Sequence, residues 1–355
     1  MSPRKQMIVG GFLAVVALAV IYVNLSSSVP KDGKALPAFT TDVVGTAPWS
    51  MPLAPRPDDI RFAIIGDRGG LSRPGVFNQA MKQIDWLKPE FVLSVGDLIE
   101  GEVEDAATVE AEWKQVEAEV ANLRVPFFYV PGNHDLNTPV TVEAWKQKRG
   151  PSYYHFIYKN VLFVVLNTED PAMPMALEGA QVYREELATL VASGEEAFHN
   201  LHNTRVAAER ATAAIDGRPR PAEYAGSTNE AKFSKDQIAY VKKVLDENRN
   251  VRWTFFLMHK PAWKTDGNFA EVEPLFAGRN YTVVAGHYHS FDHTVREGHD
   301  YFTMATTGGI GTTDGPGKMD HIAWVTVGDK EPSVAVIKLN GLLDSSGKSG
   351  QTSAY

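Results

Sequence analysis

The 355-residue chain has no cysteine and carries fewer basic than acidic side chains, and both features limit its function. Without cysteine it has no disulfide, no zinc–thiolate site and no cysteine nucleophile, so any metal must be held by Asp, Asn, His or Glu. The formal net charge of −8 argues against electrostatic binding of DNA or RNA. A small anionic substrate stays compatible with this charge, because a bound metal ion outweighs a mildly acidic surface locally.

Residues 1–28 have the composition of a membrane segment rather than of a folded domain. Arg4 and Lys5 precede an uncharged, largely apolar run over residues 7–25. As a helix this run is about 28 Å long, close to the hydrocarbon thickness of a bilayer. The basic flank predicts a cytoplasmic N-terminus and an extracytoplasmic remainder, which is periplasmic in a bacterium. The alternative is a cleaved signal peptide and a secreted protein, since small residues at 26–28 suit a cleavage site.

The next part of the chain predicts a tether followed by a βαβ pattern. Six prolines in residues 29–58 favour an extended tether. Beyond it, three apolar strands are expected at residues 60–65, 91–95 and 125–130, with helices at 74–87 and 106–122 between them. The strands end at Gly66-Asp67, Gly96-Asp97 and Gly132-Asn133-His134-Asp135. Ligands gather beyond the carboxyl ends of strands in open α/β sheets, so we expect these turns to meet in space.

The second half of the pattern is interrupted by a polar segment. A hairpin is expected at residues 153–158 and 161–166, and residues 170–233, rich in Ala, Glu and Arg, predict a helical insertion. This insertion is either a cap or interaction surface, or a solvated spacer. A helix at 234–248 and strands at 251–258, 281–285, 301–305, 322–327 and 334–339 complete the folded domain, residues 59–340. Residues 341–355 are expected to be a flexible tail.

The strand ends carry a set of potential metal ligands without a thiolate. They are Asp67, Asp97, Asn133, His259, His287 and His289, and each follows an apolar strand. Carboxylates, an amide oxygen and imidazoles suit Mn, Fe or Zn. Two such ions about 3.5–4 Å apart clamp a phosphoryl group and make a bound water nucleophilic near neutral pH.

This ordered set resembles the calcineurin-like metallophosphoesterase superfamily over roughly residues 60–340. The resemblance implies a four-layered α/β/β/α fold, with two packed mixed sheets flanked by helices and a dinuclear metal centre. It implies Asp67, Asp97 and His289 at one ion, and Asp97, Asn133, His259 and His287 at the other. It also implies that His134 assists the leaving group and that Asp135 orients His134. The expected activity is hydrolysis of a phosphate monoester or diester in a small or lipid-linked substrate.

One position departs from the superfamily pattern. Most members have a metal-binding His two residues after the first Asp, where this chain has Gly69. The purple acid phosphatase branch also has Gly there, and it compensates with a Tyr three residues after the bridging Asp. This chain has Glu100 at that place. Glu100 is therefore either a substitute ligand, direct or through water, or a side chain outside the coordination sphere.

Two further alternatives stay open at the level of sequence. Arg68 and Lys260, next to two candidate ligands, either contact substrate phosphate or are ordinary surface charges. The chain is either an active phosphoesterase or a catalytically weak, membrane-anchored binding or scaffold protein of the same fold. The retention of His134 and Asp135 favours the enzyme.

Overall fold

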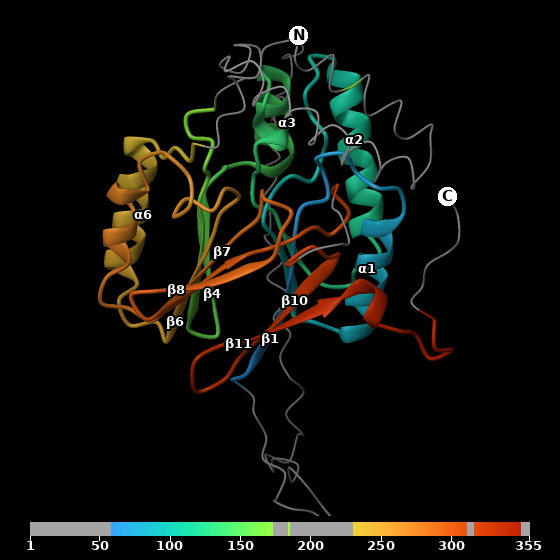
Figure 1. Ribbon diagram of the computed structural model, residues 1–355. Helices are drawn as coiled ribbons and strands as arrows, with labels where there is room; N and C mark the ends of the chain where they lie inside the picture. The colour runs from blue at the N-terminus through green and yellow to red at the C-terminus, as the bar shows by residue number, and fades with distance from the viewer. Residues whose placement is uncertain (1–57, 173–183, 185–229, 311–315, 349–355) are drawn as a thin grey trace, which may run out of the picture. The chain divides into compact units, whose positions relative to one another are not determined.

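The computed structural model describes residues 58–172, 184, 230–310 and 316–348 (Figure 1). The chain divides into two units after Pro57, and the second unit contains every described residue. The predicted anchor at 1–28, nearly all of the tether at 29–58 and most of the insertion at 170–233 lie outside the described residues, as does the end of the predicted tail. Among the described residues, no helix has the length and apolar character that a bilayer span requires.

The first sheet holds the strands that precede the three polar turns. Its order is β11-β10-β1-β2-β3, and it is mixed, because β1, β2 and β3 run parallel while β10 and β11 pair antiparallel. The bounds are β1 (Ile60–Ile65), β2 (Phe91–Ser94), β3 (Phe127–Phe128), β10 (His321–Val327) and β11 (Ser333–Lys338). The carboxyl ends of β1, β2 and β3 therefore lie along one edge of this sheet.

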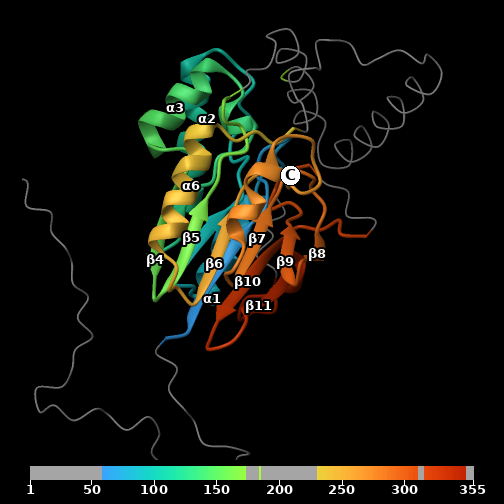
Figure 2. The same ribbon diagram turned by 90° about the vertical axis from the view of Figure 1, so that its left-hand side faces the viewer.

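The second sheet has the order β4-β5-β6-β7-β9-β8, with its strands side by side in Figure 2. It is also mixed: β5, β6, β7 and β9 are parallel, and the hairpin strands β4 and β8 run antiparallel at the two edges. The bounds are β4 (Tyr154–Tyr158), β5 (Val161–Val165), β6 (Trp253–Leu257), β7 (Tyr281–Ala285), β8 (Asp292–Arg296) and β9 (His299–Thr303).

Helices cover the outer face of each sheet, which gives the four predicted layers (Figure 1). The first sheet is covered by α1 (Val76–Leu87), α2 (Ala106–Val120) and α3 (Pro139–Arg149), and the second by α6 (Lys235–Glu247). Short 3₁₀ turns occur at η1 (His134–Leu136), η3 (Phe269–Glu271), η4 (Glu273–Phe276) and η5 (Leu339–Gly341). Ser234 is the N-cap of α6, and its hydroxyl accepts from the backbone N–H of Gln237.

Three apolar cores separate the four layers. Alternate residues of β1 point to opposite faces, so Phe62 packs between the sheets while Ala63 packs under α1 and α2. The ring of Phe62 meets those of Phe163 and Phe255 of the second sheet at centroid distances of 5.4 and 5.3 Å. Such edge-to-face pairs each contribute about 0.5–1.5 kcal/mol beyond their buried area. This packing fixes the two sheets, and hence their strand ends, against each other.

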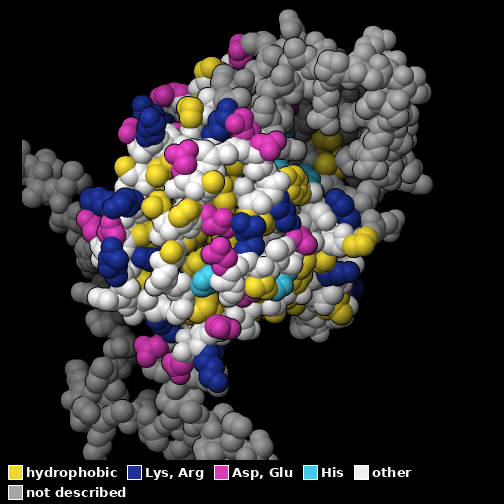
Figure 3. All heavy atoms as spheres, turned by 60° about the vertical axis from the view of Figure 1, so that its left-hand side comes forward, with side chains coloured by type: hydrophobic (Ala, Val, Ile, Leu, Met, Phe, Trp, Pro, Cys, Tyr) yellow, Lys and Arg dark blue, Asp and Glu magenta, His cyan; other side chains and the backbone are white. Residues whose placement is uncertain are grey.

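The surface in Figure 3 shows no large area of a single charge sign among its coloured residues. Basic and acidic side chains are interspersed with hydrophobic ones over this face. A face of this kind lacks the basic stripe that tracks a nucleic-acid backbone.

Candidate metal centre

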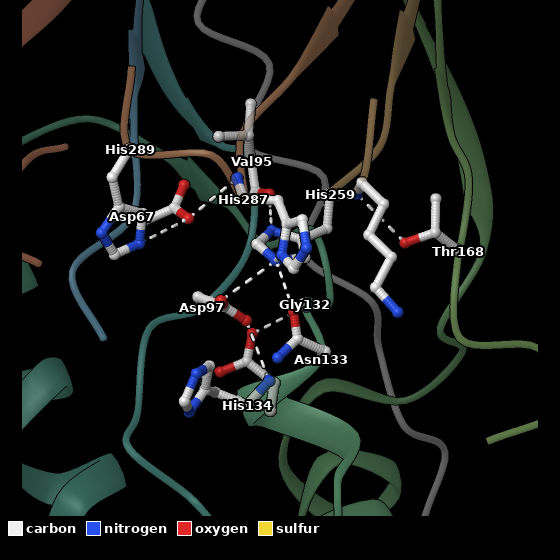
Figure 4. A network of polar contacts seen from close by, with 12 residues as sticks. Asp67, Val95, Asp97, Gly132, Asn133, His134, Thr168, His259, His287 and His289 are labelled. Atoms are coloured by element: carbon white, nitrogen blue, oxygen red, sulfur yellow. Dashed lines mark hydrogen bonds and ion pairs between the residues drawn. The ribbon is translucent and has the colours of Figure 1, made fainter. Parts of the chain in front are cut away.

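Strand ends from both sheets converge on one site, shown in Figure 4. Asp67, Asp97 and Asn133 follow β1, β2 and β3 of the first sheet, and His259 and His287 follow β6 and β7 of the second. The packing of the two sheets therefore brings together residues that are far apart in the sequence. Asp67 and His287 are 220 residues apart, yet the backbone N–H of His287 donates to Asp67 Oδ2 at 2.9 Å.

One half of the site is a buried cluster around the Nε2 atom of His259. This nitrogen lies 3.0 Å from Asp97 Oδ2, 2.9 Å from Asn133 Oδ1 and 3.2 Å from Nδ1 of His287. The other ring nitrogen of His259 donates to the Val95 carbonyl at 2.8 Å, so Nε2 is the atom presented to the cluster. Ligand atoms of Asp97, His259 and His287 all lie within 4.8 Å of one another.

The other half of the site contains Asp67 and His289. Nε2 of His289 lies 3.2 Å from Asp67 Oδ2. The second oxygen, Asp67 Oδ1, is buried and has no hydrogen-bond partner within the described part of the chain. A buried carboxylate oxygen without a partner is costly, and it suits a cation that completes its shell.

Burial and neighbouring charges shift the pKa values within the cluster in different directions, and they raise that of His259 to about 9. Burial and the neighbouring charge of His259 lower the pKa of His287 well below its ordinary value, so this ring is in the neutral form that binds metal. Burial opposes the charge of Asp97, but the positive charges of His259 and His134 outweigh it and lower the pKa of this carboxyl. The converging oxygen and nitrogen donors thus fit divalent transition metals, with Asp97 placed next to the ligands of one half.

The backbone is strained at three of the candidate ligands. Asp97, His287 and His289 have φ angles of 52°, 73° and 49°, in the left-handed region. Residues other than glycine adopt this region at a cost of order 1–3 kcal/mol, and they concentrate at functional sites. His287 lies in the half around His259, and His289 lies in the half with Asp67.

Two glycines permit the close approach of the strand ends. A Cβ on Gly132 would lie 2.1 Å from Asp97 Oδ1, and one on Gly286 would lie 2.3 Å from Asp67 Oδ1. Any side chain at either position would push a carboxylate away from the centre. The glycines of the Gly-Asn and Gly-His motifs therefore have a steric basis.

His134 lies beside the metal ligands rather than among them. Its backbone N–H donates to Asp97 Oδ1 at 2.9 Å, and its ring Nδ1 donates to the Glu100 carbonyl at 2.8 Å. Burial opposes protonation of this ring, but the charges of Asp97, Glu102 and Glu100 outweigh it and raise the pKa of His134 to about 10. A charged imidazole is suited to donate a proton or hydrogen bond.

The predicted role of Asp135 in orienting the His134 ring stays a prediction, and the structure shows the Asp135 carboxylate engaged by backbone amides. Asp135 Oδ1 accepts from the backbone N–H groups of Leu98 and Ile99, and Oδ2 accepts from that of Gly132 at 2.9 Å. Oδ1 is bonded by amides of the turn after β2, and Oδ2 by an amide of the turn after β3. Asp135 therefore holds together the turns that carry Asp97 and Asn133.

Glu100 lies with its carboxylate against the first polar turn. Its oxygens accept from the backbone N–H groups of Leu71 and Ser72 at 3.0 and 2.7 Å, and from the Ser72 hydroxyl. A ligand role for Glu100 stays a prediction, and the observed contacts give it a structural role. The absence of a histidine at position 69 also has a steric reason, because a Cβ on Gly69 would lie 2.3 Å from the Ile99 carbonyl oxygen.

Arg68 and Lys260, the predicted substrate contacts, are buried and engaged in ion pairs. Arg68 pairs with Glu119 on α2 at 2.9 Å. The ammonium group of Lys260 pairs with Glu169 at 2.9 Å and donates to the Glu230 carbonyl. Their phosphate-binding role stays a prediction.

Sequence reasoning missed the contribution of the loop after β9. The backbone N–H groups of Thr307 and Gly309 donate to the Asp67 carbonyl at 2.9 and 3.0 Å, and Nδ1 of His289 donates to the Ile310 carbonyl. The loop thereby fixes which nitrogen of His289 faces Asp67. Its run of Gly and Thr was the signal in the sequence, since short side chains allow such close backbone contact.

Comparison with known proteins decides the family. Residues 60–291, well over half of the chain, match the family described as calcineurin-like phosphoesterase. The chain belongs to this family. The phosphoesterase fold predicted from sequence, with its two mixed sheets, is confirmed. Its converging donors fit the divalent ions that the metallophosphoesterase fold implies.

Curated relatives and solved structures agree with this calcineurin-like phosphoesterase assignment. The chain is 34% identical over 118 residues to human serine/threonine-protein phosphatase CPPED1, which covers 29% of this chain and 36% of the relative. It is 30% identical over 136 residues to the rat protein, covering 34% and 42%. The match thus spans less than half of these relatives.

A dimetal phosphatase structure from Danio rerio aligns with a TM-score of 0.51 at 15% identity, covering 78% of this chain and 98% of the other. A structure of PhoD aligns with a TM-score of 0.50 at 11% identity, covering 79% and 68%.

Proposed function

We propose that this chain hydrolyses a phosphate ester at a dinuclear transition-metal centre. The observation that carries the proposal is the cluster of Asp97, His259 and His287, whose ligand atoms lie within 4.8 Å of one another next to the orphaned oxygen of Asp67. Asp67, Asp97 and His289 would hold one ion, and Asp97, Asn133, His259 and His287 the other. Bound Mn, Fe or Zn would supply an activated water and offset the charge of the phosphoryl group.

His134 is the proposed proton donor to the leaving group. The carbonyl of Glu100 can only accept, so Nδ1 carries a proton, and protonation at Nε2 makes the ring a cation. As water adds to phosphorus and the ester P–O bond breaks, the Nε2 proton passes to the departing oxygen, which leaves as an alcohol. The neutral ring then regains a proton from solvent. The proton lost by the attacking water is released to solvent, so the protons balance.

The substrate class is proposed to be a phosphate monoester or diester, small or lipid-linked. The names of the curated relatives, which are serine/threonine-protein phosphatases, favour a monoester. The apolar run at residues 7–25 supports attachment to a membrane with the catalytic domain outside the cytoplasm, or secretion after cleavage. Nucleic-acid partners are not part of the proposal, because the net charge of −8 disfavours them.

Turnover of nitrophenyl phosphate and of its diester tests this function directly. The full chain is stripped of metal, and Mn, Fe or Zn is added back singly and in pairs. We expect at least one metal to restore hydrolysis of one ester, with the metal-free protein inactive. A folded, metal-loaded protein that hydrolyses neither ester would support the alternative of a weak binding or scaffold protein of the same family.

A further inference from the structure

A groove of about 280 Å³ lies where the edge of the first sheet meets helix α3. It is lined by residues 127–129 in and after β3, by Trp145, Lys148 and Arg149 of α3, and by Tyr154 of β4. These residues are not among the candidate metal ligands. The volume is close to the lower end of the range for ligand pockets, about 300–1,000 Å³. The groove therefore has room for one small molecule.

Aromatic rings form much of the groove. Strand β3 is the last strand of the first sheet, and its residues Phe127 and Phe128, like Tyr129 after it, are all partly exposed. The hydroxyl of Tyr154 donates to the Tyr129 carbonyl at 2.8 Å, which fixes this ring against the sheet edge. Partly exposed rings on consecutive residues suit the packing of another ring against them.

Two side chains of α3 at the groove have buried N–H groups that lack an acceptor. Trp145 is 2% exposed, and its indole Nε1 has no hydrogen-bond partner within the described part of the chain. The same is true of the buried Nε of Arg149, four residues further on and hence on the same face of the helix. Both groups can only donate. A buried donor without a partner is costly, so the pair favours a ligand that supplies an acceptor.

The guanidinium of Arg149 is held in place by stacking on two rings. Its central carbon lies 4.4 Å from the ring centroid of Trp113 and 4.1 Å from that of Tyr129. The Trp113 ring in turn lies 5.8 Å from that of Trp145, so both unpartnered donors flank the same indole. A guanidinium that is fixed before a ligand arrives loses little conformational freedom on binding.

The groove also carries positive charge. Nη2 of Arg149 donates to Glu117 at 2.9 Å, and the ammonium group of Lys148 lies 2.7 Å from Glu110. The side chains of these two acids are 40% and 43% exposed, and ion pairs with exposed partners are weak. A carboxylate in the groove would meet a less exposed cation, since only 12% of the Arg149 side chain is accessible.

We propose that this groove binds a small organic anion made of an aromatic body and a carboxylate. The carboxylate accepts from Nε of Arg149 and Nε1 of Trp145, in charge-assisted contact with the guanidinium. The aromatic body packs against the rings of residues 127–129. This binding site goes beyond the proposed function, and it depends neither on a metal ion nor on the hydrolytic reaction.

Calorimetric titration of the metal-stripped full chain with 3-phenylpropionate tests the proposal. The amide 3-phenylpropanamide has the same body without the charge, and propionate has the charge without the ring. We expect a Kd of about 1 mM or tighter for the acid, and an affinity at least about tenfold weaker for the amide and for propionate. Equal affinity for acid and amide, no binding of the acid, or binding that appears only after metal is added back would overturn the proposal.

Arg149→Met removes the charge and the Nε–H but keeps an unbranched stem against the two rings. We expect it to weaken binding of the acid about tenfold or more, and to abolish the preference for the acid over the amide. The matched control is Arg124→Met, because the side chain of Arg124 is 73% exposed and pairs with Asp85. It should bind as the wild type does. Unchanged affinity in Arg149→Met would overturn the assignment.

A crystal of the wild-type chain soaked with 3-(4-bromophenyl)propionate locates the ligand without any variant. We expect the anomalous signal of bromine beside residues 127–129. Bromine found only at another place, or at no place, would overturn the proposal even where Arg149→Met fails to fold. A protein that binds the acid in this groove but hydrolyses no phosphate ester would lose the proposed reaction and keep this site.

Discussion

Replacement of His134 by alanine is expected to lower turnover by about 10²–10⁴-fold, the range for loss of a general acid. The ring lies beside the ligands, and its Nδ1 is engaged by the Glu100 carbonyl, so its removal does not take a donor from the centre. The contact that His134 makes with Asp97 comes from its backbone N–H, which alanine keeps. Metal content and the free energy of unfolding should therefore change little.

The measurement is kcat on an alkyl phosphate and on nitrophenyl phosphate, together with metal analysis of the same samples. His293→Ala is the matched control, because this histidine is partly exposed on β8 and pairs with Asp300. It should behave as the wild type. Near-wild-type turnover of the alkyl ester by His134→Ala would remove His134 from the mechanism.

Asp97→Asn should have the second large effect, on metal binding itself. Asp97 is buried, and its Oδ2 lies 3.0 Å from His259 Nε2 while Oδ1 accepts from the His134 backbone. The amide has nearly the same size but lacks the negative charge, and it offers one oxygen instead of two. We expect metal affinity to fall by more than the roughly 10–100-fold typical of losing an outer partner of a ligand. Turnover should fall with it.

Metal titration of the stripped variant, followed by calorimetry, measures this effect. Asp329→Asn is the control, since Asp329 is exposed in the turn after β10. Wild-type affinity in Asp97→Asn would contradict the placement of the centre between the two sheets. A loss of folding in the variant, seen by circular dichroism, would instead show that Asp97 is needed for the turn itself.

The convergence of the candidate ligands was predictable because each of these side chains follows an apolar strand. The position of each donor therefore depends on strand order alone, as for Asp67 after β1 and His287 after β7. Strand β8 and helix α3 were missed. β8, with the sequence DHTVR, is a mostly polar edge strand without an apolar alternation. Helix α3 has a weak apolar face, and only its Thr138-Pro139 start carried a recognisable capping signal.

The roles of the polar residues around the ligands were less predictable. Asp135, Glu100 and Lys260 are engaged by backbone amides or by acids that are distant in sequence. Such partners are set by which strand ends lie side by side within each sheet, which no local motif encodes.

The central claim is that the strand ends of both sheets together hold metal ions. The most direct measurement is the number and position of ions in crystals of the full chain soaked in Mn or Zn, located by anomalous scattering. We expect about two ions, one beside Asp97, His259 and His287 and the other beside Asp67 and His289. Crystals that hold metal at neither position, from protein that is folded and free of chelator, would contradict the account.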